Sequence, residues 1–246
     1  MSFAIAPALA AMLRAARNVL VLTGAGVSAE SGVPTFRDAQ TGLWAQFDPL
    51  ELATPRAFAR NPRLVWDWYA WRRELLATVA PNAGHHALVA IERRVPRFLL
   101  ATQNVDGLHA AAGSRALVEL HGNLARVICS REHTLVSTWA EPADGMPPRC
   151  ACGAWLRPDV VWFEENLPPQ ALAEAQRAAE ECDLMLVAGT AAEVYPAAAL
   201  PLAARRAGAC VVEINPQPTP LSGDMDFVLR APSGVALPAL VAAAWP

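Results

Sequence analysis

Residues 20–38 read Leu-Val-Leu-Thr-Gly-Ala-Gly-Val-Ser-Ala-Glu-Ser-Gly-Val-Pro-Thr-Phe-Arg-Asp, an apolar run that leads directly into a glycine turn and a polar segment. Gly24 and Gly26 allow the backbone to turn tightly and to approach a pyrophosphate without an intervening Cβ. The usual dinucleotide fingerprint has a third glycine three residues later, but Ala29 occupies that position here. A Gly-x-Gly turn alone can be an ordinary tight turn. The longer polar segment favours a nucleotide site, although a plain dehydrogenase fits poorly.

Composition limits the classes of function. The chain has 246 residues, 54% of them hydrophobic, which is enough for a full core in one large domain or in a domain with a smaller insert. The formal net charge of -3 argues against nucleic acid or an anionic membrane as the main partner. The apolar N-terminal run is expected to be a helix rather than a signal peptide, because its arginines follow it. Five cysteines without an export signal predict a reducing, cytoplasmic location.

Short apolar runs alternate with helical stretches, which predicts an α/β fold. Because several runs are continuous rather than alternating, we expect a doubly wound parallel sheet covered on both faces. The expected strands are 19–22, 97–101, 184–187, 210–214 and 227–229. Two segments interrupt this rhythm and are expected to form a smaller lobe: a helical part, 40–80, and a cysteine-containing part, 124–157. The large lobe, which contains the parallel sheet, would then comprise 1–39, 81–123 and 158–246.

Polar residues follow the expected strands. Gln103, Asn104 and Asp106 lie after the second strand, where their side chains could bind a carboxamide and ribose hydroxyls. Asp106 alone could instead cap the next helix. His121 precedes a glycine and could accept a hydroxyl proton near pH 7, although a lone histidine is more often structural. Small and polar residues after the later strands, including Gly189 and Asn215, would converge on the same crevice.

Six motifs, in order, resemble the sirtuin family of NAD-dependent protein deacylases. They are Gly-Ala-Gly-Val-Ser-Ala-Glu-Ser-Gly-Val-Pro-Thr-Phe-Arg-Asp, Thr-Gln-Asn-Val-Asp-Gly-Leu-His, His-Gly-Asn, Val-Val-Trp-Phe, Gly-Thr and Ile-Asn-Pro. The resemblance covers nearly the whole chain. It implies a Rossmann-like lobe and a helical, zinc-ribbon-like lobe, with NAD and an acyl-lysine peptide bound between them.

The resemblance also implies roles for individual residues. His121 would be the general base, and Asn104 and Asp106 would orient the ribose and the displaced amide. The residues expected at NAD are Gly24, Ala25, Gly26, Ser28, Glu30, Thr35, Phe36, Arg37, Gln103, Asn104, Asp106, Gly189, Thr190, Asn215 and Val235. Those expected to pair with the peptide by strand addition are Val160, Val161, Trp162 and Phe163.

The implied reaction consumes NAD. The acyl oxygen would attack the anomeric carbon of the nicotinamide ribose and release nicotinamide, after which His121 would promote transfer of the acyl group to the 2′ oxygen. Two other functions remain open from the sequence: a catalytically idle NAD-binding sensor module, and a protein ADP-ribosyltransferase. The partner would be an acyl-lysine protein or peptide, with no direct nucleic acid and no membrane. A monomer is favoured.

Tyr69 and Arg72 stand three residues apart on an expected helix and therefore share a face. A phenol and a guanidinium together could bind a carboxylate, although on an arbitrary helix a core tyrosine beside a solvated arginine is the ordinary outcome. This Tyr-x-x-Arg resembles the sirtuin subgroup that removes succinyl and malonyl groups. We therefore expect those acyl groups to be preferred over acetyl.

The small lobe departs from the family pattern of two cysteine pairs. Cys129 is followed by Glu132 and His133 where a second cysteine is expected, and Cys150 and Cys152 are separated by one residue. Three thiolates with Glu132 or His133 could hold a structural zinc ion, and a metal-free lobe is the alternative. Two further departures are Glu164, where the family usually has glycine, and Ala191, where it usually has serine.

Overall fold

The computed structural model describes residues 4–34, 48, 52–140, 142 and 145–246. Its main element is a six-stranded sheet in the order β3-β2-β1-β6-β7-β8, in which every neighbouring pair is parallel. The strands are β1 (Asn18–Thr23), β2 (Arg97–Thr102), β3 (Leu117–Glu119), β6 (Leu184–Ala188), β7 (Cys210–Ile214) and β8 (Phe227–Leu229). The expected parallel, doubly wound sheet is confirmed.

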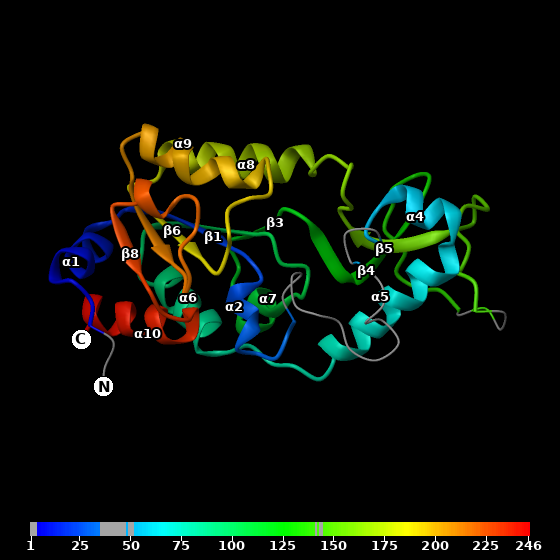
Figure 1. Cartoon of the computed structure of the whole chain (residues 1–246), viewed down its shortest axis with the longest axis horizontal. Helices are drawn as coiled ribbons and strands as arrows, with labels where there is room; N and C mark the ends of the chain where they lie inside the picture. Colours follow the sequence, from blue (N-terminus) through cyan, green and yellow to red (C-terminus); the bar gives the residue numbers. More distant parts are fainter. Residues whose placement is uncertain (1–3, 35–47, 49–51, 141, 143–144) are drawn as a thin grey trace.

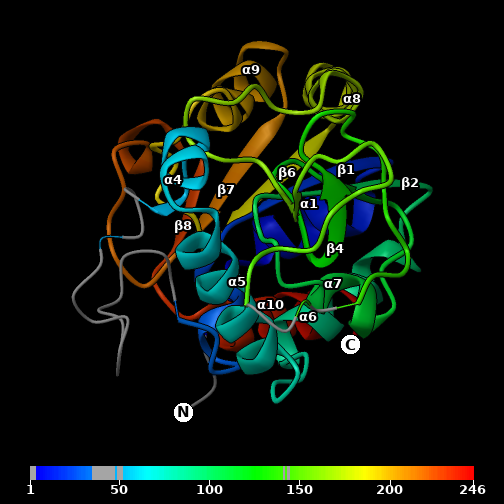
Figure 2. The ribbon, with the colours of Figure 1, turned by 90° about the vertical axis from the view of Figure 1, so that its right-hand side faces the viewer.

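Helices cover both faces of this sheet, as Figure 1 shows. One face carries α1 (Pro7–Ala15), α6 (Ala83–Glu92) and α10 (Ser233–Ala244), and the other carries α8 (Pro169–Glu181) and α9 (Leu200–Arg206). Strand β6 is buried at every position, which explains its continuous Leu-Met-Leu-Val-Ala sequence. The same layering is visible from the side, with the sheet between the two helical layers (Figure 2).

The order of the strands indicates where a binding crevice is expected. The chain runs from the central β1 outward to β2 and β3, and later returns beside β1 to build β6, β7 and β8. The direction of winding therefore reverses between β1 and β6, and parallel sheets bind ligands at such a point, beyond the carboxyl ends of the strands. Two short helices lie after those ends, α2 (Gly26–Ala29) after β1 and α7 (Leu108–Ala112) after β2.

A second group of elements lies at one end of the molecule (Figure 1). It contains α4 (Pro55–Arg60), α5 (Pro62–Leu76) and an antiparallel pair, β4 (Gly122–Cys129) with β5 (Leu156–Val160). Thr54 and Asn61 cap the two helices, and each helix begins with a proline. The expected boundary at residues 157 and 158 thus falls inside β5. Two short 3₁₀ helices, Ala197–Ala199 and Ser222–Asp224, also occur in the described part of the chain.

The small group has its own core, which packs α5 against β4 and the segment after β5. Its largest buried side chains are Phe58, Trp68, Tyr69, Leu124 and Trp162. No helix in the described part of the chain is both long and apolar enough to cross a membrane. All five cysteines are free thiols.

Candidate active site

The glycine turns after β1 and β6 pack directly against each other. Gly24 N–H donates to the carbonyl of Ala188, and Gly26 N–H donates to Gly189 at 2.8 Å. A Cβ on Gly26 would lie 2.8 Å from Gly189 Cα, and one on Gly189, where φ is +60°, would lie 2.3 Å from the amide nitrogen of Val27. Both glycines are therefore required by contact between two backbones. The sequence explains Gly26 by a tight turn and the approach of a pyrophosphate, and does not predict this contact between the two turns.

Polar side chains join these turns to the neighbouring strand ends. The amide of Gln103 donates to Thr190 Oγ1 at 3.0 Å, and the amide of Asn215 donates to the carbonyl of Thr190 at 3.0 Å. Residues that follow β1, β2, β6 and β7 thus meet at one edge of the sheet. This is the convergence that the sequence predicted.

Ser28, Asn104 and Asp106 form one hydrogen-bonded group. Ser28 Oγ accepts from Asn104 Nδ2 at 3.2 Å and donates to Asp106 Oδ2 at 2.7 Å. The other carboxylate oxygen, Oδ1, accepts from the backbone of Leu108. Asp106 therefore caps the turn into α7, which was the structural alternative considered from the sequence. It also takes part in the polar group at the crevice.

His85 extends this group, which sequence reasoning missed. His85 completes the capping box of α6 with Asn82. The amide of Asn82 donates to His85 Nδ1, so the ring proton lies on Nε2, which is 3.4 Å from Ser28 Oγ. Its signal in the sequence was the Asn-x-x-His spacing, but nothing local connects residue 85 with residue 28.

His109 lies beside His85 and was not among the site residues expected from the sequence. It is 2% exposed, its Nε2 lies 2.9 Å from Thr23 Oγ1, and its ring centroid is 4.8 Å from that of His85. Desolvation lowers the pKa of His85 to about 4 and that of His109 to about 3. Both imidazoles are neutral at pH 7.

His121 has the geometry of a proton acceptor. Its Nδ1 lies 3.0 Å from the carbonyl oxygen of Gln103, which can only accept, so Nδ1 carries the proton and Nε2 presents a lone pair. Burial lowers the pKa of His121, and the hydrogen bond to Gln103 opposes that shift. The imidazole is therefore neutral near pH 7, the state required of a general base.

Glu30 and Val235 lie together at the start of α10. A carboxylate oxygen of Glu30 accepts from the amide of Gly234 at 2.6 Å, which stabilises the positive end of that helix. Val235 is 45% exposed. Ala25 stands at the start of α2, beside the glycine turn. The expected NAD residues Thr35, Phe36 and Arg37 lie outside the described residues.

Tyr69 and Arg72 lie on one face of α5, as their spacing predicted. Arg72 Cζ is 5.7 Å from the centre of the Tyr69 ring and 5.1 Å from that of Trp68. Among the described residues Arg72 has no ion pair. Desolvation lowers its pKa, while Tyr69 and Asp106 raise it, which places this cation within electrostatic reach of the Ser28–Asp106 group.

Tyr69 is fully buried in this structure. Its hydroxyl accepts a hydrogen bond from the indole N–H of Trp162 at 3.0 Å. Burial raises the pKa of Tyr69 to about 12, so the phenol stays protonated.

The segment expected to bind the peptide follows β5. Val160 pairs with Gly122, Val161 N–H donates to the carbonyl of His121, and Phe163 N–H donates to the carbonyl of Ala53. The amide of Trp162 donates to Glu165. Since the amides of residues 161–163 are already bound within the chain, strand addition along them would rely on other backbone groups.

Cys129, Cys150, Cys152 and Glu132 form a cluster whose ligand atoms all lie within 4.8 Å of one another. A tetrahedral zinc ion with Zn–S bonds of about 2.3 Å needs thiolates roughly 3.8 Å apart. The 3.5 Å separation of Cys129 Sγ and Cys152 Sγ is close to that value. The amides of Glu132 and Arg131 lower the pKa of Cys129. The cluster is compatible with a structural zinc ion, and its fourth member is Glu132 rather than His133.

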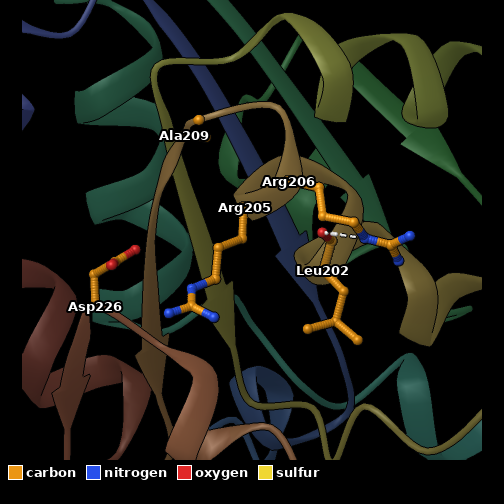
Figure 3. Close-up of a pocket in the computed structure, with 6 residues that line it drawn as sticks. Leu202, Arg205, Arg206, Ala209 and Asp226 are labelled. Atoms are coloured by element: carbon orange, nitrogen blue, oxygen red, sulfur yellow. Dashed lines mark hydrogen bonds between the residues drawn. The ribbon is translucent and has the colours of Figure 1, made fainter.

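A surface hollow of about 490 Å³ lies at the opposite edge of the sheet, where β7 and β8 begin (Figure 3). Leu202, Arg205, Arg206, Gly208, Ala209 and Asp226 line it. Its arginines pair or bond locally: Arg205 with Asp224, and Arg206 with the carbonyl of Leu202. It is separate from the polar residues at the carboxyl edge.

Comparison with known proteins defines the class. The Sir2 family model matches residues 24–196, and this chain belongs to that family. A relative from Ralstonia nicotianae, named NAD-dependent protein deacylase, is 54% identical over 98% of each chain. A solved Sir2 homologue in complex with NAD superposes with a TM-score of 0.91 at 44% identity, covering 98% of this chain and 94% of that one. Sir2 bound to an acetylated peptide superposes with a TM-score of 0.82 at 30% identity, covering 92% of each chain.

Proposed function

We propose that this protein is an NAD-dependent protein-lysine deacylase that prefers succinyl and malonyl groups over acetyl. Its family, its NAD-dependent relatives and the crevice at the switch between β1 and β6 support the deacylase activity. The observation that carries the acyl preference is Arg72, a half-buried cation without an ion pair in the described chain, beside the protonated phenol of Tyr69. A guanidinium in this position can bind a carboxylate with charge-assisted hydrogen bonds, which an acetyl group cannot accept.

Each residue of the crevice has a task in this reaction. NAD supplies the electrophilic ribose carbon to which the acyl oxygen bonds as nicotinamide leaves. His121 Nε2 takes a proton from the ribose hydroxyls so that the 2′ oxygen can receive the acyl group. Asn104 and Asp106, held by Ser28, orient the ribose and the amide that is displaced. One water molecule is consumed as the lysine amine leaves, and the products are free lysine, nicotinamide and 2′-O-acyl-ADP-ribose.

The deciding experiment compares succinyl, malonyl, glutaryl and acetyl peptides, with nicotinamide and acyl-ADP-ribose measured together. We expect Arg72→Met to lower kcat/KM for the succinyl peptide by roughly 10- to 100-fold, the worth of a charged hydrogen bond, while deacetylation persists. Desuccinylation that is unchanged in Arg72→Met would refute the acyl preference. Transfer of label from NAD to protein would support an ADP-ribosyltransferase, and absence of nicotinamide release would support an idle NAD-binding module.

A further inference from the structure

The side chain of Trp162 is held in one orientation by the residues packed around it. The side chain is 2% exposed, with Arg157 Cζ 3.3 Å from the centre of its ring and the Phe58 ring 5.3 Å away. Its backbone amide donates to Glu165 Oε2 at 2.8 Å. An indole confined in this way has little rotamer freedom, so the direction of its N–H is preset.

A buried ion pair holds the turn that carries Trp162. Arg157 is 4% exposed and binds Glu165 through two hydrogen bonds, of 2.6 and 2.8 Å. Its second guanidinium nitrogen also donates to the carbonyl of Val160 at 2.8 Å. The pair thus closes residues 157–165 into one unit, and the same carboxylate that binds Arg157 holds the amide of Trp162.

The indole N–H of Trp162 sets the hydrogen bonding of Tyr69. An indole nitrogen can only donate, so the Tyr69 oxygen must accept the 3.0 Å bond between them. The phenol then keeps one proton to donate. No acceptor for that proton occurs among the described residues, and the nearby Arg72 has only donors. A buried donor without a partner is costly, which favours a ligand acceptor at this point.

We propose that Trp162 is a specificity-determining positioning residue, which orients the phenolic proton of Tyr69 toward the carboxylate of a dicarboxylic acyl group. The inference rests on the proposed succinyl and malonyl preference. The hydrogen bond from Trp162 to Tyr69 also connects two parts of the substrate site. Tyr69 lies on α5, which would recognise the acyl group, and Trp162 lies in the segment after β5. An acetyl group ends in a methyl that accepts no hydrogen bond, so the effect of Trp162 is confined to acyl groups with a carboxylate.

The test is a double-mutant cycle on Trp162→Phe and Tyr69→Phe, measured with succinyl and acetyl peptides. Trp162→Phe keeps an aromatic ring over Arg157 but removes the N–H. We expect the ratio of kcat/KM for the succinyl peptide to kcat/KM for the acetyl peptide to fall about five- to tenfold, with the change arising in KM for the succinyl peptide. In the Tyr69→Phe background, the same substitution should add no further loss. Trp66→Phe is the matched control, because Trp66 is also a buried tryptophan but lies on α5. This substitution should leave the succinyl-to-acetyl ratio unchanged.

Three outcomes would overturn the inference while the proposed function stands. The first is an unchanged KM for the succinyl peptide in Trp162→Phe, and the second is a double variant whose loss of kcat/KM is the sum of the two single losses. The third is an equal loss of kcat/KM for succinyl and acetyl peptides, which would mean a merely structural role. If the wild-type enzyme shows no preference for succinyl peptides and Arg72→Met does not change desuccinylation, the proposed acyl preference is refuted. The inference about Trp162 is then refuted with it.

Discussion

Glu164 shows how a single residue can conflict with its local backbone. Its φ is +75°, in the left-handed region that favours glycine, and its carboxylate forms an ion pair with Arg56 of α4. An L-residue in this region costs about 1–2 kcal/mol, whereas an exposed ion pair contributes about 0–1 kcal/mol. The free-energy cost of the backbone conformation therefore exceeds the stabilisation by the ion pair, so a contribution to stability does not explain why glutamate occupies this position.

We accordingly expect Glu164→Gly to raise the free energy of unfolding by up to about 1 kcal/mol, because it removes the strain at the loss of an exposed pair. Urea denaturation followed by tryptophan fluorescence measures the change. Arg56→Gln is the control, since it removes the pair but leaves the strained backbone, and it should lower stability slightly. A Glu164→Gly variant less stable than Arg56→Gln would contradict this account.

The β4–β5 ribbon has little apolar burial at the end that carries the cysteines. Leu124 and Val160 pack into the core shared with α5, whereas near the cysteines only Trp66 of α5, Val127 and Leu156 form a buried apolar cluster among the described residues. An isolated two-stranded ribbon is marginally stable in water, and a structural metal is a common means of stabilising one. The cysteine cluster lies at the end of β4 and in the turn before β5, where a metal would join the two strands.

We expect the purified protein to retain about one zinc ion per chain, a number typical of one tetrahedral site. Glu132→Gln should weaken zinc binding, measured by competition with a chromophoric chelator, whereas His133→Gln should not, because only Glu132 belongs to the cluster. Removal of zinc should lower the Tm. Loss of zinc in His133→Gln with full retention in Glu132→Gln would show that the fourth ligand is misassigned.

At the scale of the whole molecule, the buried histidines link folding to pH. Desolvation lowers the pKa of His85 to about 4 and that of His109 to about 3. A group whose folded pKa lies below its unfolded value, about 6.5 for histidine, binds more protons in the unfolded state at acidic pH. Its contribution to stability is complete above pH 6.5 and is lost as the pH falls toward the folded values.

We therefore expect the Tm to fall progressively from pH 6.5 to pH 4, measured by differential scanning calorimetry at constant ionic strength. His109→Gln keeps a donor for Thr23 but does not titrate, so its Tm should depend less steeply on pH even if the variant is less stable at pH 7. An equal slope in wild type and variant would rule out His109 as a source of the effect.

The sequence by itself determined the sheet and the edge where the site lies. The apolar runs, the glycine turn after residue 23 and the polar residues after residue 102 are local signals, because a strand buried on both faces must be apolar throughout and ligand-facing residues must follow its end. The Tyr69 and Arg72 pair was likewise readable from helical spacing. These features hold wherever the element lies in the molecule, and the structure confirms the sheet they predict.

Only the tertiary structure decided which distant residues meet. Trp162 lies 93 residues from its partner Tyr69, and His85 lies 57 from Ser28. Whether Glu132 or His133 faces the three thiols depends on how the loop closes against the turn before β5. Such contacts depend on how the helices that connect the strands and the inserted elements pack together. The hydrophobic periodicity of the sequence does not predict them. The physical reason is that burial and spacing act within one element, whereas hydrogen-bond partners are chosen between elements.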